Sequence, residues 1–338
     1  MKKSVIKKLG LLLMLLLTFS LLAPIGNTKI EAKVKMNKKQ ITLSTGEWKK
    51  LKIKNMTYEI GDIKWSSSDK AVANVSRKGW VVGLVKGKCK ITAEVLATGK
   101  TFTCDVTVET PDAKTRVIDP TKPIIALTFD DGPAGYTNGL LDTLKSYGVT
   151  ATFFMCNNNC VTNGISKYAD TIREMYNYGC EIANHTNSHP QLSKISEEKI
   201  KSEVLGNADV IKKVIGTNNR LLLRPPYGAY NDTVKAVCQA PLILWSVDTL
   251  DWKVKGQSNA TDLILSEIKK SAHDGYIILM HDIHSTSCEA VKAVIPWLIQ
   301  QGYQVCSVSE MFEARGVELE DGVVYTKCIT AEQYKSKK

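Results

Sequence analysis

The residues of this 338-residue chain that could do chemistry begin with two adjacent carboxylates, Asp130 and Asp131, which follow the apolar stretch IIALTF. A turn at Gly132-Pro133 accounts for one aspartate at this position, but not for two. Two neighbouring carboxylates repel each other unless a positive group holds them. The pair therefore indicates either a metal ligand or a general base beside a cation.

A pair of histidines, His185 and His189, lies four residues apart in the stretch HTNSH. This spacing lets two imidazoles face one metal from a single turn, although such a pair is as often structural. The sequence is not HExxH, so the base that a metalloprotease carries between its histidines is missing here. The Asp130-Asp131 pair is the obvious source of a base. An Asp-His-His set leaves a fourth position for water or substrate, as in catalytic metal sites.

Three more polar groups follow later apolar stretches. Arg224 begins RPPYG, and its guanidinium, which stays protonated, can hold a carboxylate ionised and oriented. The prolines stiffen that loop, so the backbone N–H of Tyr227 could face a developing oxyanion. His281 ends the stretch YIILMH, and a histidine oriented by a carboxylate suits a general acid. His273 and His284 fit no such scheme and are interpreted as surface residues.

The elements that must position these groups alternate between strand and helix patterns after residue 122. Seven strand candidates separated by helical segments favour a parallel sheet, closed into a barrel or doubly wound. The barrel is preferred because the polar motifs follow many different strands, and barrel enzymes place their chemistry at that rim. The strand candidates are IIALTF, ATFFM, CEIAN, LLLRP, LILWSV, YIILM and YQVCSV.

The five motifs TFDDGP, HTNSH, RPPYG, DTLDW and LMH occur in this order and together resemble the motifs of the polysaccharide deacetylase family. The resemblance spans residues 123–315 and implies a distorted (β/α)7 barrel. It also implies a metal-dependent carbohydrate deacetylase with one divalent metal, zinc first and cobalt or another ion as alternatives. The implied roles are: Asp131, His185 and His189 as metal ligands; Asp130 as base, paired with Arg224; the Tyr227 amide at the oxyanion; His281 as acid, oriented by Asp251; and Trp252 and Leu279 around the acetyl methyl group.

The segment before the barrel is predicted to form a small all-β sandwich. Residues 33–108 contain short alternating strands broken by glycines, a pattern typical of sandwiches. The stretches WSSSDKAVANVS, KGWVVGLVKGKCKITA and TCDVTV resemble a bacterial immunoglobulin-like (Ig-like) domain of group 2. This resemblance implies a scaffold or a module that contacts the cell wall. Residues 109–122 are interpreted as a linker, and 316–338 as a tail that includes a hairpin, VELEDGVVYT.

Residues 1–32 have a basic start, a short apolar run and small residues near Ala32, which is typical of a secretory signal. An uncleaved membrane anchor is the alternative, and no later segment is long and apolar enough to span a bilayer. We therefore expect a secreted or cell-surface protein. Export permits disulfides, but most of the nine cysteines are interpreted as small core residues.

Without residues 1–32 the chain has a net charge near +7, which either favours an anionic wall or membrane surface or only aids solubility. No basic stripe is interleaved with aromatic residues, so nucleic acid is not expected as a partner. The predicted substrate is a polysaccharide with N-acetylglucosamine units, with peptidoglycan preferred. The alternatives are deacetylation of chitin oligomers or acetylxylan, including ester cleavage, or a wall-binding protein without catalysis.

Overall fold

The structure is a computed structural model that describes residues 33–158 and 164–329. The predicted signal segment, residues 1–32, lies outside the described residues. So do Cys160 and the last nine residues of the predicted tail. Within the described ranges no helix combines the length and apolar character that crossing a bilayer requires.

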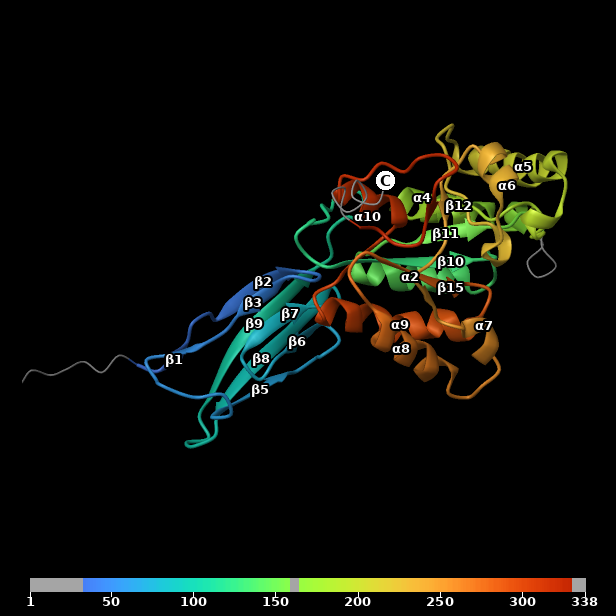
Figure 1. The fold of residues 1–338 in the computed structure, drawn as a ribbon. Coiled ribbons are helices and arrows are strands. Elements are labelled where there is room, and N and C mark those ends of the chain that lie inside the picture. Colours follow the sequence, from blue (N-terminus) through green and yellow to red (C-terminus); the bar gives the residue numbers. More distant parts are fainter. Residues whose placement is uncertain (1–32, 159–163, 330–338) are drawn as a thin grey trace, which may run out of the picture. The chain divides into compact units, whose positions relative to one another are not determined.

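The first part is the expected all-β sandwich of alternating buried and exposed residues (Figure 1). One sheet has the order β2-β9-β8-β5 and the other β3-β7-β6, while β1 pairs with β4. Every second side chain of β2 and of the long strands β8 and β9 points inward, which buries Leu43, Ile91 and Val106. The bounds are β1 Lys35–Met36, β2 Gln40–Ser44, β3 Trp48–Lys50, β4 Ile53–Lys54, β5 Ile63–Ser67, β6 Ala73–Val75, β7 Trp80–Gly83, β8 Gly87–Val95 and β9 Thr101–Glu109.

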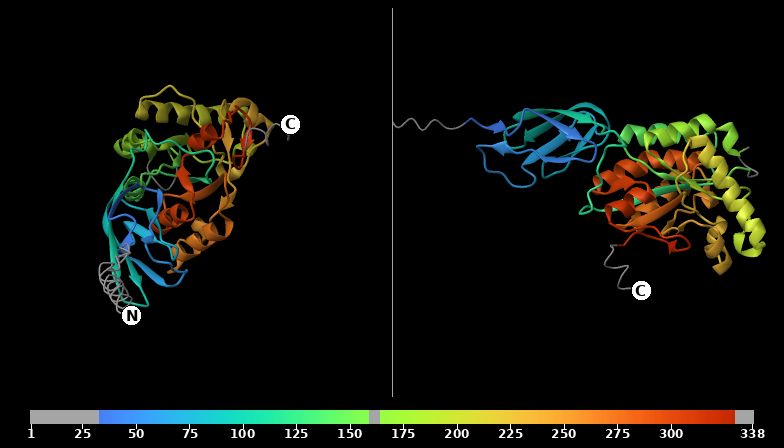
Figure 2. Two further views of the ribbon diagram at one scale, coloured as in Figure 1. Left: turned by 90° about the vertical axis from the view of Figure 1, so that its left-hand side faces the viewer. Right: turned by 90° about the horizontal axis from the view of Figure 1, so that it is seen from above.

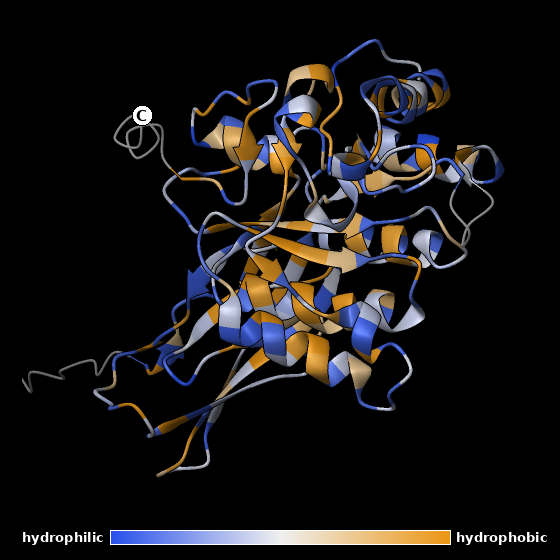
Figure 3. Cartoon of the chain, turned by 45° about the vertical axis from the view of Figure 1, so that its right-hand side comes forward, coloured by the Kyte–Doolittle hydropathy of each residue, from blue (hydrophilic) through white to orange (hydrophobic). Residues whose placement is uncertain are grey.

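The second part is the distorted barrel, whose strands are parallel and largely hydrophobic (Figure 3). Its central strand β10 is buried at all seven positions, as expected for a strand covered on both faces. The sheet runs β12-β11-β10-β15-β14, and β16 also pairs with β10. The bounds are β10 Ile124–Asp130, β11 Thr152–Met155, β12 Glu181–Asn184, β13 Leu242–Ile243, β14 Val247–Asp248, β15 Tyr276–His281, β16 Gln304–Cys306 and β17 Val324–Tyr325.

Two predicted strands of the barrel differ from the structure. The stretch LLLRP forms only isolated bridges through Leu223, to Asn184 and Leu242, because Pro225 and Pro226 have no N–H with which to extend a ladder. The stretch LILWSV bends into β13 and β14, and its two halves pair with different neighbours. The ring therefore closes through a bridge and a bend, which is the distortion of this barrel.

The predicted hairpin in the tail is wrong. Its second half, β17, pairs in parallel with β13 instead of antiparallel with the preceding residues. The N–H groups of Leu242 and Leu244 donate to the carbonyls of Val323 and Tyr325. Strand β17 thus pairs with β13, which is distant in sequence, instead of with the adjacent first half of the predicted hairpin.

The helices surround these strands and join them in the predicted alternation (Figure 2). Several end at a glycine in the left-handed conformation, as at Gly148, Gly179 and Gly216. The bounds are α2 Thr137–Tyr147, α3 Gly164–Lys167, α4 Ala169–Tyr178, α5 Glu197–Ile215, α6 Asp232–Val237, α7 Asp251–Val254, α8 Ala260–Ser271, α9 Ser285–Gln300 and α10 Val308–Ala314, with 3-10 turns η1 Leu192–Lys194 and η2 Pro226–Gly228.

The segment predicted as a linker carries one buried anchor, Arg116. Its guanidinium forms an ion pair with Glu310 at 3.0 Å and donates to the carbonyls of Gly148 and Val305, both at 3.0 Å. The side chain is only 9% exposed. This end of the segment is therefore fixed to the loops between barrel elements.

Candidate active site

The pairing of the central strands brings four of the five motifs to one edge of the barrel. Asp130 is the last residue of β10 and lies opposite His281, the last residue of β15. Met155 at the end of β11 lies opposite Asn184, so His185 follows at the same edge. The carbonyl of Asn184 accepts from the Arg224 N–H, which adds the RPPYG loop. Parallel strands therefore place residues far apart in sequence beside one another.

Asp131, His185 and His189 form a group whose potential ligand atoms all lie within 4.8 Å of one another. Oδ1 of Asp131 is 3.5 Å from Nε2 of His185 and 3.3 Å from Nε2 of His189. Nδ1 of His185 lies 2.7 Å from the Arg224 carbonyl oxygen, which can only accept. The proton therefore sits on Nδ1 and the Nε2 lone pair faces Asp131.

The protonation of His185 also suits a metal ligand. Burial lowers its pKa to about 3, so the imidazole is neutral at physiological pH. Two imidazole nitrogens and one carboxylate oxygen are a donor set that zinc and cobalt accept, with a further position left for solvent or substrate. The residues present therefore fit a single divalent transition metal.

Two polar residues of α5, Glu203 and Asn207, hold the histidine loop, and the sequence reasoning did not identify them. The Glu203 carboxylate accepts from the N–H and the hydroxyl of Ser188, both at 2.7 Å. Asn207 donates to the Asn184 side-chain oxygen at 2.7 Å, and that oxygen also accepts from the Thr186 N–H. Both side chains are at most 1% exposed. The signal was available, because a glutamate and an asparagine four residues apart interrupt the apolar face of the helix.

Asp130 and Arg224 form a buried ion pair, with Oδ1 2.7 Å from Nη1. The guanidinium also donates to the Thr128 hydroxyl at 2.8 Å and to the carbonyls of Ile243 and Leu244, both at 3.0 Å. Burial raises the pKa of Asp130 above the ordinary carboxyl range, and the charge of Arg224 opposes this rise. Arg224 is thus fixed by four acceptors, and Asp130 is a carboxylate whose basicity burial increases.

His281 and Asp251 form a second buried pair, with Nδ1 2.8 Å from Oδ1. The other carboxylate oxygen accepts from the His281 N–H at 2.7 Å and from the Ser287 hydroxyl at 2.6 Å. Burial by itself would lower the pKa of His281. The hydrogen bond and charge of Asp251 outweigh burial and raise that pKa to about 9. Ser287 is a further residue that the sequence reasoning missed, because α9 brings it here only in three dimensions.

The remaining predicted site residues lie at the same edge. Tyr227 is 69% exposed, and its ring centroid is 4.7 Å from that of His189. Trp252 is 45% exposed and follows Asp251 in the chain. Its backbone N–H donates to the Asp251 carboxylate. Leu279 is only 4% exposed on β15. Two aromatic rings and a buried aliphatic side chain thus accompany the polar groups.

The backbone at this edge is unusual. Among residues 33–158 and 164–329, seven residues other than glycine have positive φ, and five of them stand in or beside the motifs. Such conformations are costly for side chains with a Cβ and tend to cluster at functional sites. The five are Asp131, Thr186, His189, Tyr227 and Leu250. Their residue types do not indicate these angles, because none of the five is a glycine.

Asp282 lies behind the site, fully buried, and accepts a hydrogen bond from the Thr137 hydroxyl. Burial raises its pKa to about 7. A Cβ on Gly132 would stand 2.2 Å from an Asp282 carboxylate oxygen, so this close approach requires glycine. Of the two histidines expected at the surface, His273 is exposed as expected, whereas His284 is half-buried with its ring 5.9 Å from that of His281.

Comparison with known proteins agrees with this geometry. The polysaccharide deacetylase family matches residues 118–241, and the group 2 bacterial Ig-like domain matches residues 32–106. The peptidoglycan-N-acetylmuramic acid deacetylase PdaC of Bacillus subtilis is 37% identical over 203 residues, which are 60% of this chain and 41% of PdaC. The chain therefore spans about two fifths of the length of that relative.

This chain covers most of the length of two further proteins. A peptidoglycan-N-acetylglucosamine deacetylase of Bacillus cereus is 35% identical over 197 residues, which are 56% of this chain and 87% of the relative. The structure of a family 4 acetyl xylan esterase of Clostridium thermocellum in complex with a cobalt ion is 29% identical. It aligns with a TM-score of 0.55 over 60% of this chain and 98% of the esterase.

Proposed function

Because this chain belongs to the polysaccharide deacetylase family, we propose that it is an exported, metal-dependent hydrolase that removes N-acetyl groups from peptidoglycan. The observation that carries the proposal is the Asp131, His185 and His189 triad at the same edge of the barrel as two buried pairs. One pair is Asp130–Arg224 at 2.7 Å, and the other is Asp251–His281 at 2.8 Å. A metal triad together with a carboxylate base and an imidazole acid suits amide hydrolysis.

The two pairs divide the proton transfers between them. Asp130 takes a proton from the attacking water, and burial makes this carboxylate more basic than an ordinary one. His281, whose pKa of about 9 keeps it protonated at neutral pH, donates a proton to the leaving nitrogen. An amine leaves poorly without that proton. Either group contributes a factor on the order of 10²–10⁴ to the rate.

The other residues of the site bind and orient. Asp131, His185 and His189 would hold one divalent metal, zinc first, which supplies Lewis acidity and lowers the pKa of water toward ~7. The Tyr227 backbone N–H would face the developing oxyanion. Trp252 and Leu279 would enclose the acetyl methyl group, which requires an apolar surface beside the polar groups.

The names of two relatives support the proposed substrate. One relative is named for N-acetylmuramic acid and another for N-acetylglucosamine of peptidoglycan. We place N-acetylglucosamine first and the muramic acid unit second. Acetylxylan is the alternative that the esterase neighbour favours, since the same groups can cleave an ester.

The test is acetate release by the chain without residues 1–32. The substrates are peptidoglycan, N-acetylchitopentaose and acetylxylan, each tested after chelation and again with zinc or cobalt restored. Asp130→Asn removes the base, and Asp142→Asn is the matched control because Asp142 is exposed on α2. Metal content and thermal stability are measured for every variant, so that a missing base is separated from a missing metal or a lost fold.

Metal-dependent release from peptidoglycan by the wild type and the control, but not by Asp130→Asn, is the expected result. Mass spectrometry of the digested product then assigns the deacetylated sugar as glucosamine or muramic acid. Release from acetylxylan alone would replace the proposal with the esterase function. A metal-loaded, folded chain that releases no acetate from any substrate would favour the wall-binding protein without catalysis.

A further inference from the structure

The positive charge of this protein is concentrated in its Ig-like domain. Residues 33–108 contain sixteen lysine and arginine residues against six acidic ones, a net charge of +10. Residues 109–338 contain twenty-four basic and twenty-seven acidic residues, a net charge of −3. A charge difference of this size directs an acidic partner to the first domain and away from the barrel.

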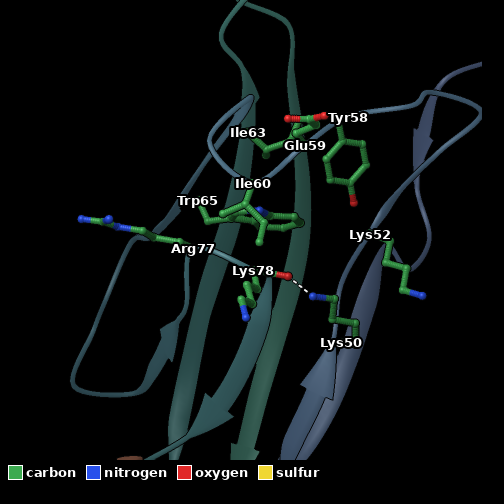
Figure 4. A pocket seen from close by; sticks show the side chains of 9 residues that line it. All are labelled: Lys50, Lys52, Tyr58, Glu59, Ile60, Ile63, Trp65, Arg77 and Lys78. Carbon is green, nitrogen blue, oxygen red and sulfur yellow. Dashed lines mark hydrogen bonds between the residues drawn. The ribbon is translucent and has the colours of Figure 1, made fainter.

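One hollow of the Ig-like domain combines this charge with an aromatic floor (Figure 4). It has a volume of about 190 Å³ and a half-buried tryptophan, Trp65, on strand β5. In Figure 4 Lys50 and Lys52 are drawn on one side of the Trp65 ring and Arg77 on the other, with the Arg77 side chain directed away from the ring. The complete lining is Lys50, Lys52, Tyr58, Glu59, Ile60, Ile63, Trp65, Arg77 and Lys78.

The backbone around this hollow is fixed rather than loose. Gly79 closes the turn that carries Arg77 and Lys78, with φ +77°, and a Cβ there would stand 2.8 Å from the Trp65 ring. The Gly79 carbonyl accepts from the Leu51 N–H at 2.9 Å. The Lys50 ammonium donates to the Lys78 carbonyl. The turn is thus held against both the tryptophan and the segment that carries the lysines.

Most of the charge at the hollow is uncompensated. Within the residues that the structure describes, Lys52, Arg77 and Lys78 have no carboxylate within ion-pair distance, whereas Lys64 and Lys90 of the same domain each have one. Glu59 is the only acidic residue among the lining residues. Burial and the neighbouring charges of Lys52 and Lys78 lower the pKa of Lys50, so the cations at this hollow repel one another. An anion bound among them would relieve this repulsion.

We propose that this hollow binds an acidic glycan, a sugar chain that carries phosphate or carboxylate groups. The apolar face of a sugar would pack on Trp65, and Lys52, Arg77 and Lys78 would bind the acidic groups around it. A concave site with an aromatic floor suits a sugar ring better than a flat membrane surface, against which apolar side chains must project. The site goes beyond the proposed deacetylase activity, because it lies in the other domain and needs no acetyl group.

The test compares two triple variants of the chain without residues 1–32. The first, Lys52→Gln/Arg77→Gln/Lys78→Gln, removes three cations from the hollow. The second, Lys86→Gln/Lys88→Gln/Lys100→Gln, removes three cations of the same domain that do not line the hollow. Both change the net charge equally. Dissociation constants are measured for dextran phosphate, carboxymethyl dextran, neutral dextran, polyphosphate and vesicles that contain phosphatidylglycerol.

The wild type should bind one or both acidic dextrans more tightly than neutral dextran, polyphosphate or the vesicles. Which acidic dextran binds identifies phosphate or carboxylate as the recognised group. The first triple variant should weaken binding roughly tenfold, since three ion contacts worth about twofold each multiply, and the second should change it little. Equal weakening by both variants would overturn the proposal, because it would mean that the overall charge of the Ig-like domain, and not the hollow, attracts the acidic dextran. Equal or tighter binding of polyphosphate or vesicles would overturn the glycan as ligand.

A Trp65→Leu variant tests the floor, with thermal unfolding as the check that the domain still folds. This variant should weaken the binding of acidic dextran while leaving the binding of polyphosphate unchanged. The opposite pattern would contradict sugar packing on this ring. Acetate release from soluble N-acetylchitopentaose should be the same in all these variants. The glycan site and the deacetylase activity can therefore fail independently.

Discussion

Removal of the Asp251 carboxylate should move the alkaline limit of activity to lower pH. His281 must be protonated to donate to the leaving nitrogen, so turnover falls as pH rises through its pKa. That pKa is about 9 because Asp251 outweighs the effect of burial. In Asp251→Asn the negative charge is gone while burial remains, so the pKa should lie at or below its ordinary value of ~6.5.

The magnitude follows from these two values. With a pKa of about 9, His281 is almost fully protonated at pH 7 and largely so at pH 8. With a pKa of ~6.5, only about a quarter of the molecules carry the proton at pH 7 and about 3% at pH 8. The difference between the two values corresponds to about 3 kcal/mol of stabilisation of the imidazolium. The ratio of variant to wild-type turnover should therefore fall steadily from pH 6 to pH 9.

An asparagine cannot take the place of this carboxylate by rotating. The two Asp251 oxygens accept from four donors: Nδ1 of His281, its backbone N–H, the Trp252 N–H and the Ser287 hydroxyl. Either orientation of an amide NH2 faces a backbone N–H, so one donor must lose its acceptor. Ser287→Ala removes one of the four donors but leaves the negative charge of Asp251. It should therefore shift the pKa of His281 less than Asp251→Asn does.

The assay is kcat for acetate release from N-acetylchitopentaose between pH 6 and pH 10, with the metal content of each variant confirmed. Asp262→Asn is the charge-matched control, since Asp262 is exposed in the first turn of α8. An Asp251→Asn enzyme with the same alkaline limb as the wild type would refute the assignment of His281 as the acid that Asp251 holds protonated.

The remaining predictions concern the base, the metal and the support of the histidine loop. Asp130→Asn should lower kcat by a factor on the order of 10²–10⁴ with metal content unchanged. If the variant lost its metal in step with its activity, Asp130 would be a metal ligand instead of the base. Chelation should abolish activity and lower Tm, and His189→Ala should bind metal more weakly by titration than the wild type. Glu203→Gln should weaken metal binding about tenfold or more through the loop, whereas Glu197→Gln on the exposed start of α5 should not.

The positions of Asp130 and His281 could be predicted because each ends a strand that is recognisable from its apolar residues. Parallel strands have their carboxyl ends at one edge, so the order of the motifs along the chain was enough to bring them together. The register confirms this, since the two residues lie directly opposite each other on β10 and β15.

The residues that hold the motifs could be predicted less well. Ser287 reaches Asp251 only because α9 packs behind the site, and no spacing in the sequence relates the two. Glu203 and Asn207 differ, because they stand on the face of α5 that also carries Ile200, Val204 and Ile211. Polar residues on an apolar helical face must find partners when buried, so the helical pattern by itself indicates a role for these two. The left-handed backbone of Asp131 and Tyr227 had no such signal.

The two buried ion pairs of the site look alike but differ in which partner can change its protonation. Arg224 is permanently charged and is bound by four acceptors, so at that pair only Asp130 can gain a proton. Asp251 is bound by four donors and its pKa lies below the ordinary carboxyl value, so at the second pair only His281 can lose one. Environments that move the pKa values of two titratable groups apart in this way indicate which group is the base and which is the acid. Protons should therefore enter the site's groups at Asp130 and leave them at His281.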